Sequence, residues 1–408
     1  MINVGIVFGG QSPEHEVSVI TSLQAAAVLD PEKYLAVPIY VSKNGVWYTG
    51  NSMLDISAYT DLNALLGRSH VLSLQPTADH LLTLQYGNEG GLFARSRPDI
   101  HLDILFMGLH GGAGENGGIQ GLCEFANVPY TGSGVLASAL SMDKARSKEY
   151  CREKGIPVVQ FRAIRETEWA GREDAVIAEL EIEFGFPLIV KPLTLGSSIG
   201  ISLVTSQNEC DAAIEEAFRY DETVIVEHAV ENLREINCSV LGTEDFAEAS
   251  VLEEPVSDSA LLSFKEKYMQ GLDSGSAKTP PSSTKSVPSA GMASSGRIIP
   301  APLSDQKTQE IKKLSILIFK TLGCAGVARI DFLMDAETEE IFFNEINTIP
   351  GSFSYYLWEP SGVSFSVLVH RLIEIGFAKH RQRVERIRSY DVNLLAENGA
   401  RGLKGSKA

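Results

Sequence analysis

The chain of 408 residues lacks several features that would place it in a specialised protein class. Its cysteines number five, an odd count, and no two form a CxxC pair, so neither a zinc ribbon nor a disulfide framework is predicted. No run of about 20 apolar residues occurs, which argues against a transmembrane helix. The N-terminus lacks a basic region followed by a long apolar run, so no signal peptide is predicted. We therefore expect a cytoplasmic protein without a membrane partner.

Basic residues are also scarce relative to acidic ones. Lys and Arg total 35 and Asp and Glu total 52, which gives a net charge of −17. This balance argues against nucleic acid as a partner, because proteins bind it through basic surfaces. A few local lysines and a divalent cation could still hold the phosphates of a nucleotide. The chain is too long for one core of ordinary size, so we expect two or three domains.

Two strand-like segments near the C-terminus are the most informative part of the chain. They are residues 326–335 (GVARIDFLMD) and 340–348 (EIFFNEINT), and the polar residues 336–339 between them predict a hairpin turn. Because residues two apart in a strand face the same side, Arg329 shares a face with Asp331. Glu345 shares a face with Asn347 for the same reason. Folding about the turn would bring Asp331 to within about one position of Glu345.

This predicted face carries two carboxylates, an amide oxygen and a guanidinium. The three oxygen-bearing groups are ligands for a hard cation such as Mg²⁺, and Arg329 adds a fixed positive charge. An ion-pair ladder on an exposed sheet is the alternative interpretation. The apolar residues that flank these side chains favour the cation site.

The first part of the chain predicts a layered α/β domain. Residues 2–8 predict a buried strand, and Ser12-Pro13-Glu14 predicts the start of a helix that runs to about residue 29. Strands at 35–41 and 103–109 continue the alternation, which is typical of a mostly parallel sheet. Ligands of such sheets bind beyond the carboxyl ends of the strands, where Glu14 and His110 lie. A helix-start carboxylate and a structural histidine are the alternative interpretations.

Residues 144–230 predict a small mixed α/β unit. We expect a helix over 142–154, capped by Ser141 or Asp143, and further on a strand at 186–192 that leads into LGSSIG. Small residues in such a loop let backbone N–H groups approach phosphate oxygens, while Lys191 and Lys144 would supply charge. An ordinary hairpin turn is the alternative. Neither the GxxxxGK[ST] order of a P-loop nor the GxGxxG of a nicotinamide-binding fold occurs.

A further strand is expected at 223–230, and Glu227 lies near its end. The backbone of residues 228–230 could pair with the edge of an adenine, and a carboxylate such as Glu235 could hold ribose hydroxyls. An exposed strand end is the alternative interpretation.

The chain changes composition over residues 270–296, which are rich in Ser, Gly and Pro. Such a segment cannot bury a core, so we expect either a mobile lid beside a site or an interdomain linker. Helices are predicted over 304–322 and 363–380, and residues 381–408 predict a disordered tail.

Several motifs, in this order along the chain, resemble the D-alanine–D-alanine ligase family of the ATP-grasp superfamily. They are FGGQSPEHEVS (8–18), HGGAGENGGIQG (110–121), YTGSGVLASALSMDK (130–144), VKPLTLGSSIG (190–200), KEKY (265–268), ARID (328–331) and NEINTIPGS (344–352). The resemblance implies three α/β domains with ATP between two antiparallel sheets. These would be an N-terminal parallel-sheet substrate domain (1–143), a central ATP-grasp subdomain (144–236) and a C-terminal subdomain (237–380) with a lid at about 268–297.

The resemblance also implies roles for individual residues. Those implied in catalysis are Glu14, Ser197, Tyr268, Arg329 and Gly351. ATP would be bound by Lys144, Lys191, Ser198, Glu227, His228, Ala229, Val230, Glu235 and Lys267. The amino-acid substrates would contact Glu14, His110, Tyr356 and Leu357. Two Mg²⁺ or Mn²⁺ ions would be held by Asp331, Glu345 and Asn347.

The implied activity is ATP-dependent joining of two D-alanines, through an acyl phosphate, for peptidoglycan precursor synthesis. The sequence departs from the family pattern at Asn116, where Asp is usual, at Tyr356, where serine is usual, and by one extra residue before Glu235. A ligase for another second substrate, D-serine or D-lactate, therefore stays open, as does a non-catalytic nucleotide-binding relative. A homodimer is expected by the resemblance alone.

Overall fold

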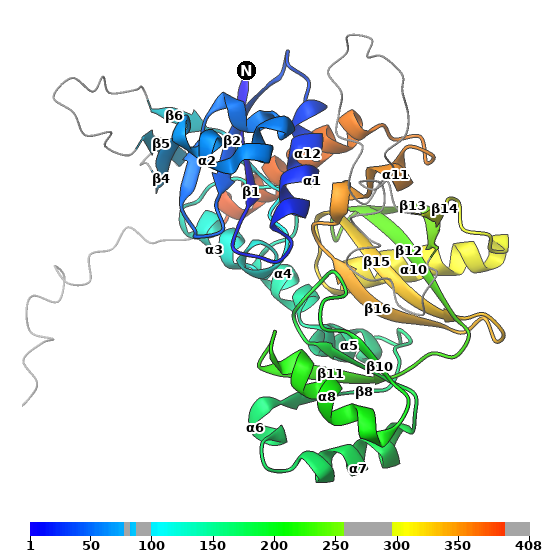
Figure 1. Ribbon diagram of the computed structural model, residues 1–408. Helices are drawn as coiled ribbons and strands as arrows, with labels where there is room; N and C mark the ends of the chain where they lie inside the picture. The colour runs from blue at the N-terminus through cyan, green and yellow to red at the C-terminus, as the bar shows by residue number, and fades with distance from the viewer. Residues whose placement is uncertain (77–81, 87–98, 257–295, 388–408) are drawn as a thin grey trace, which may run out of the picture.

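The computed structural model describes residues 1–76, 82–86, 99–256 and 296–387. They form three α/β units, each built on its own sheet (Figure 1). Lys267, Tyr268 and nearly all of the expected lid lie outside the described residues, as does most of the expected tail. The division of the chain at residues 143, 236 and 380 stays a prediction.

The N-terminal sheet has seven strands in the order β6-β5-β4-β3-β2-β1-β7. Only its core is parallel, where β1 (Ile2–Gly9) lies between β2 (Tyr34–Val41) and β7 (Ile104–Met107). The other strands, which pair antiparallel, are β3 (Trp47–Thr49), β4 (His70–Pro76), β5 (Leu82–Tyr86) and β6 (Ile100–Leu102). The sheet is therefore mixed rather than mostly parallel. Antiparallel neighbours need no helical crossover, which explains why strand–helix alternation is weak in this stretch.

Short helices fill the connections of this unit. Between β3 and β4 lie η1 (Asn51–Leu54), η2 (Ile56–Asp61) and α2 (Leu62–Gly67), and after β7 come η3 (Gly112–Gly114) and α3 (Gly118–Phe125).

Helix α1 (His15–Ala27) begins two residues later than the sequence predicts. Ser12 accepts hydrogen bonds from the Glu14 N–H through Oγ (3.0 Å) and from the His15 N–H through its carbonyl (3.2 Å). These bonds form a turn before the helix, so Glu14 rather than Ser12 takes the N-cap position.

The last helix of the described residues covers the first sheet. Helix α12 (Phe365–Val384) places Leu368, Val369 and Leu372 in one core with residues of β1 and β7. It ends four residues later than predicted, with Arg381 and Arg383 in its last turn, where cations complement the helix dipole.

The central unit is a four-stranded antiparallel sheet in the order β10-β9-β11-β8. Its strands are β8 (Phe161–Arg165), β9 (Leu188–Pro192), β10 (Ser202–Val204) and β11 (Thr223–His228), with α6 (Glu166–Trp169), α7 (Glu173–Phe184) and α8 (Gln207–Phe218) packed against them. The predicted helix over 142–154 is confirmed as α5 (Lys144–Glu153), and a separate helix, α4 (Val135–Met142), precedes it. Asp143, one of the two predicted caps, caps α5, because its carboxylate accepts the Arg146 N–H at 2.9 Å.

The C-terminal unit is a five-stranded antiparallel sheet in the order β14-β13-β12-β15-β16. Its strands are β12 (Leu233–Gly242), β13 (Ala247–Pro255), β14 (Arg297–Ile298), β15 (Gly326–Asp335) and β16 (Ile341–Asn347). Helix α10 (Asp305–Thr321) covers one face, and η5 (Gly351–Ser354) and α11 (Tyr355–Trp358) follow β16. The predicted hairpin is confirmed, since Asp331 lies directly opposite Glu345 and Arg329 opposite Asn347.

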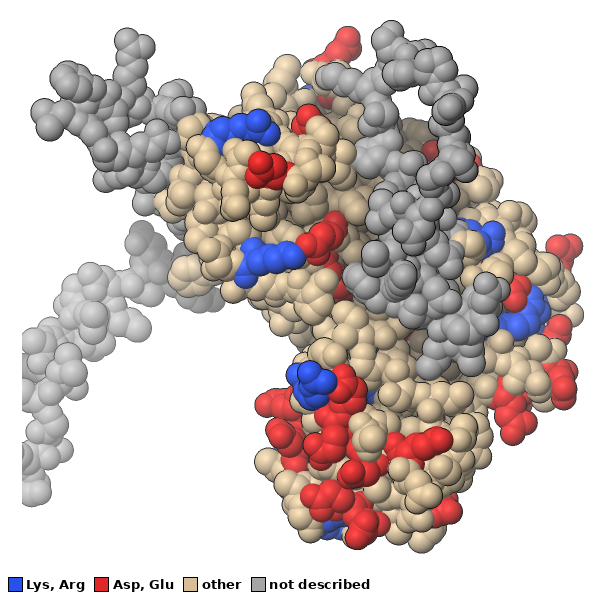
Figure 2. Space-filling view, in the orientation of Figure 1, with Lys and Arg blue, Asp and Glu red and all other residues tan. Residues whose placement is uncertain are grey.

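Acidic side chains gather on the surface of the central unit, over α6, α7 and α8 (Figure 2). A nucleic-acid backbone would be repelled from this face. Within the described ranges, no helix is both long enough and apolar enough to cross a bilayer. The cytoplasmic location stays a prediction.

Candidate active site

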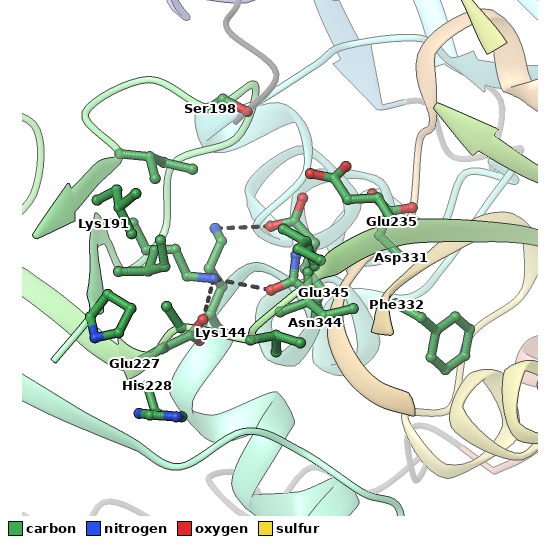
Figure 3. A pocket seen from close by; sticks show the side chains of 18 of the residues that line it. Lys144, Lys191, Ser198, Glu227, His228, Glu235, Asp331, Phe332, Asn344 and Glu345 are labelled. Carbon is green, nitrogen blue, oxygen red and sulfur yellow. Dashed lines mark hydrogen bonds and ion pairs between the residues drawn. The ribbon is translucent and has the colours of Figure 1, made fainter. Parts of the chain in front are cut away.

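A cavity of about 300 Å³ lies between the central and C-terminal sheets (Figure 3). Strands β9 and β11 form one wall, and β12, β15 and β16 form the other. The structure brings together here many residues that the sequence predicts for ATP and metal binding: Lys144, Lys191, Ser198, Glu227, His228, Ala229, Val230, Glu235, Asp331 and Glu345. Its volume is within the usual range for a small-molecule site.

Two lysines hold the carboxylate of Glu227 inside the protein. Lys191 Nζ lies 2.8 Å from one of its oxygens and Lys148 Nζ lies 2.9 Å from the other. Burial would raise the pKa of Glu227, but the two lysines lower it. Burial lowers the pKa of Lys148 to about 8, against the pull of Glu227. The Glu227 side chain is therefore committed to the lysines, and a carboxylate for ribose has to come from elsewhere.

Lys148 was not recognised from the sequence. It lies four residues after Lys144 and thus on the same side of α5, which is the signal that could have found it. Its side chain is fully buried.

Lys144 joins three parts of the cavity. Its Nζ donates to the carbonyls of Leu195 (2.7 Å) and Leu193 (3.4 Å) and lies 3.7 Å from Glu345. Burial lowers the pKa of Lys144, and Glu345 opposes that shift. Lys191 also donates to Asn344 Oδ1 at 3.1 Å, so Lys144 from α5 and Lys191 from β9 both reach β16 (Figure 3).

The glycine-rich loop after β9 carries the predicted serines to the edge of the cavity. Ser197 and Ser198 both have left-handed backbone, with φ of 58° and 59°. Ser198 lines the cavity, while the Ser197 hydroxyl donates to the carboxylate of Glu14. This bond places the N-cap of α1 beside the loop, so two of the residues that the resemblance implies in catalysis are in contact.

Two glycines leave room for the Glu14 carboxylate. A Cβ atom at Gly111 would lie 2.8 Å from Glu14 Oε2, and one at Gly196 would lie 3.1 Å from it. Only a residue without a side chain avoids these contacts. A smaller cavity of about 20 Å³ adjoins the carboxylate and shares Lys144, Gly196 and Glu345 with the larger one.

The predicted metal ligands meet on β15 and β16. Arg329 donates to both oxygens of Asp331, each at 2.6 Å, and Asn347 Nδ2 donates to Asp331 Oδ2 at 3.1 Å. Burial alone would lower the pKa of Arg329, but Asp331 raises it, so the guanidinium keeps its charge. Asp331 and Glu345 line the larger cavity, and Glu345 and Asn347 line the smaller one.

His110 is buried close to Arg329. Burial, and then the charge of Arg329, lower the pKa of His110 to about 3, so its imidazole is neutral at physiological pH. Its Nε2 is buried and has no hydrogen-bond partner among the described residues.

Glu115 is a second buried residue that sequence reasoning missed. Its carboxylate accepts the N–H of Gly111 at 2.7 Å and the N–H of Ile349 at 3.2 Å. These bonds connect the glycine-rich loop after β7 to the segment after β16. Burial, and then Glu14, raise its pKa to about 8. Its position in the glycine-rich motif at 110–121 was the available signal.

Gly351, predicted for catalysis, and Tyr356 and Leu357, predicted for the second substrate, line neither of these two cavities. Gly351 is buried at the start of η5, and Leu357 is buried beside Val251 and Ile299. The hydroxyl of Tyr356 donates to Glu253 Oε1 at 3.2 Å.

The geometry defines the class of protein. A nucleotide-sized cavity lies between two antiparallel sheets, with buried lysines on one side and paired carboxylates on the other. This is the architecture of an ATP-grasp enzyme, and the Glu14 carboxylate lies at a smaller cavity that adjoins the nucleotide cavity.

The chain belongs to the D-alanine–D-alanine ligase family. The family model described as D-ala D-ala ligase N-terminus matches residues 3–133, and that described as D-ala D-ala ligase C-terminus matches 150–290 and 284–374. The D-alanine–D-alanine ligase of Thermosipho melanesiensis is 35% identical over 97% of this chain and 98% of its own.

Solved structures agree with this assignment. The D-alanine-D-alanine ligase from Coxiella burnetii is 28% identical, has a TM-score of 0.74, and the match covers 94% of this chain and 96% of that one. The VanG D-Ala:D-Ser ligase from Enterococcus faecalis is 29% identical with a TM-score of 0.73, over 92% and 99% of the two chains.

Proposed function

We propose that this chain is an ATP-dependent ligase that joins two D-alanines into D-alanyl-D-alanine for peptidoglycan precursors. One observation carries the proposal. The nucleotide-sized cavity and the smaller cavity beside Glu14 share Lys144, Gly196 and Glu345. A phosphoryl group in the first cavity and an amino-acid carboxylate near Glu14 could therefore meet at these shared residues.

ATP would bind between the two sheets. Lys144, Lys191 and the Ser198 loop would hold its phosphates, and the resemblance adds Lys267. The N–H groups of His228 and Ala229 already donate to Gln160 and Pro187 carbonyls, so the adenine would pair with the remaining backbone groups of residues 228–230. Glu235 would hold the ribose, because Glu227 is engaged by lysines.

Asp331, Glu345 and Asn347 would hold two Mg²⁺ or Mn²⁺ ions. The donor set fits, since two carboxylates and an amide on adjacent strands face the cavities that would receive the phosphates. Bound ions would neutralise charge on the transferring phosphoryl group. Asp331 would then need Arg329 less as its counter-ion, which would free the guanidinium to face an oxyanion.

The reaction would proceed in two displacements. The carboxylate of the first D-alanine attacks the γ-phosphorus of ATP, the bond to ADP breaks, and an acyl phosphate forms. The amine of the second D-alanine attacks the acyl carbon, loses a proton and expels phosphate. The charge of the tetrahedral oxyanion would be opposed by Arg329 and the Gly351 N–H.

The substrates would be oriented by residues on both sides of the acyl carbon. Glu14 would bind the first amino group, held by Ser197 and, by resemblance, Tyr268. Neutral His110 would lie near the same substrate, while Tyr356 and Leu357 would contact the second.

Phosphate release by the full-length protein with ATP and Mg²⁺ tests the proposal. Release is expected with D-alanine and not with L-alanine, and mass spectrometry should identify D-alanyl-D-alanine. D-serine and D-lactate as competing acceptors decide the second substrate, which the neighbour described as a D-Ala:D-Ser ligase makes worth testing. A lack of phosphate release with every amino acid would indicate a non-catalytic relative.

A second copy of the chain is the partner that we propose. Leu122 and Phe125 on α3 and Leu136 on α4 are 45%, 91% and 72% exposed, and exposed apolar groups on neighbouring helices are typical of interfaces. Light scattering should give a dimer for the wild type and a monomer for Phe125→Asp. A monomeric wild type would contradict this proposal.

A further inference from the structure

A row of polar residues crosses four strands of the C-terminal sheet. Glu253 on β13 lies opposite Asn237 on β12, Asn237 opposite Asp331 on β15, and Asp331 opposite Glu345 on β16. Directly paired residues share one face of a sheet, and neighbouring strands lie about 4.8 Å apart. Glu253 is therefore about 10 Å from Asp331. At the β13 end, the row is separated from β15 by β12, and Glu253 itself does not line the nucleotide cavity (Figure 1).

Three side chains bind the carboxylate of Glu253. Oε1 accepts from Asn237 Nδ2 at 3.1 Å and from the Tyr356 hydroxyl at 3.2 Å. Oε2 accepts from Arg297 Nη1 at 2.7 Å. The Arg297 guanidinium also lies over the Tyr356 ring, 4.1 Å from its centre. Tyr356 is thus held both at its hydroxyl and on one face.

Burying this cluster costs folding free energy, which a purely structural role would not require. Glu253 is 0% exposed and Arg297 is 9% exposed at its side chain, so both ions have left water. Well-packed apolar residues are often as stabilising as a buried ion pair, or more so. The cluster is also next to the reaction face, since Asn237, which donates to Glu253, lies directly opposite Asp331.

We infer that Glu253 and Arg297 are positioning residues that fix Tyr356 beside the second amino acid, so that the enzyme selects an acceptor with a small apolar side chain over a hydroxylated one. This inference rests on the proposed function. The proposed function already includes a contact between Tyr356 and the second substrate. The inference adds the two residues that hold Tyr356 in place and the selection between acceptors that results.

The selection follows from hydrogen bonding. The single proton of the Tyr356 hydroxyl is donated to Glu253, and burial and Glu253 raise the pKa of the phenol, so the proton stays in place at neutral pH. The part of Tyr356 that is left for an acceptor is the carbon ring. A D-serine hydroxyl against the ring would lose its hydrogen bonds to water, whereas the methyl group of D-alanine would lose none.

Competition between equal concentrations of D-alanine and D-serine as acceptors tests the inference in the full-length protein. Glu253→Gln keeps the shape of the side chain but removes its charge, and Tyr356→Phe keeps the ring but removes the hydroxyl. Each is expected to raise the KM for the acceptor D-alanine about tenfold relative to the KM for ATP and to raise the share of D-alanyl-D-serine. Glu253→Gln removes the ion pair with Arg297 and Tyr356→Phe removes the hydroxyl bond to Glu253, but both loosen one connected cluster, so the double variant should change less than the sum of the two single variants.

Glu254→Gln is the matched control. Glu254 is the next residue on β13 and pairs with Arg234 at 2.7 Å, so this variant breaks a comparable ion pair on the opposite face of the strand. It should leave the product ratio unchanged. If Glu253→Gln does not fold, Tyr356→Phe carries the test alone, because phenylalanine preserves the packing.

An unchanged acceptor KM and product ratio in folded Tyr356→Phe would overturn the inference, as would an equal shift in Glu254→Gln. Failure of the proposed function looks different, because the wild type would then release no phosphate with D-alanine. A wild type that forms D-alanyl-D-alanine, with variants that behave identically, would refute only the role of the cluster.

Discussion

Replacing Glu227 by glutamine should destabilise the protein and weaken ATP binding together. Glu227 is the only carboxylate within ion-pair distance of both Lys148 and Lys191 among the described residues. Glutamine keeps the shape of the side chain but removes its charge. Two ammonium groups would then face each other in a site that is almost completely shielded from water.

The structure sets the size of the effect. The side chains of Lys148, Lys191 and Glu227 are 0%, 5% and 2% exposed, and the two ion pairs measure 2.9 and 2.8 Å. Removing one partner of a buried pair costs about 3–5 kcal/mol. Part of that cost comes from deprotonating Lys148. Its pKa is already about 8 with Glu227 in place and would fall further without this carboxylate. We therefore expect a loss of about 3–5 kcal/mol in the free energy of unfolding.

Urea unfolding followed by circular dichroism measures this loss, and the KM for ATP reports on the displaced Lys191. Glu216→Gln is the control, since Glu216 forms an ion pair of similar length (2.8 Å) with Arg219 on the exposed surface of α8. That variant should unfold like the wild type. A Glu227→Gln protein with unchanged stability and unchanged KM for ATP would refute the description of this site as a buried charge cluster.

Three further predictions follow from the same structure. Asp331→Asn and Glu345→Gln should each lower Mg²⁺-dependent phosphate release by about 100-fold or more while the circular dichroism spectrum stays native, and near-normal turnover at moderate Mg²⁺ would contradict the metal assignment. His110 has a pKa of about 3 when folded and 6.5 in the reference state, so the unfolded chain binds the extra proton between these values. Wild-type stability should therefore fall by on the order of 1 kcal/mol per pH unit as the pH drops below about 6.5, and urea unfolding at pH 7, 6 and 5 should show that His110→Gln lacks this contribution. Burial raises the pKa of all five cysteine thiols to about 11 or 12, and they belong to Cys123, Cys151, Cys210, Cys238 and Cys324. None of them should therefore react with a thiol reagent at pH 8 until the protein is unfolded. A thiol that reacts quickly in the folded protein would contradict its burial.

Local patterns were sufficient for the central hairpin of the site. The two-residue period of β15 and β16 and the polar turn between them predicted that Asp331 and Glu345 would face each other, and the structure pairs them directly. The predicted cap at Asp143 is confirmed as well, since α5 begins at Lys144, directly after it. The same reasoning placed the N-cap of α1 at Ser12, two residues before the observed N-cap at Glu14. Ser12 forms a local turn with the backbone there, and helix propensity alone does not reveal whether the turn or the helix is favoured.

The sequence by itself determined the chemistry of the site: the metal-type oxygen ligands on one strand face, the lysines near a glycine-rich loop, and the family to which these motifs are similar. Only the tertiary structure decided which charges are buried and what they bind. Lys148 on helix α5 binds Glu227 on strand β11, Glu115 accepts the Ile349 N–H across 234 positions, and Tyr356 donates to Glu253 across 103. The periodicity of hydrophobic residues and the helix caps depend on residues that are close along the chain. The free energy of burying a charged side chain instead depends on every group that packs around it. These groups come from elements that are far apart in the sequence, and they meet only when the three sheets pack together.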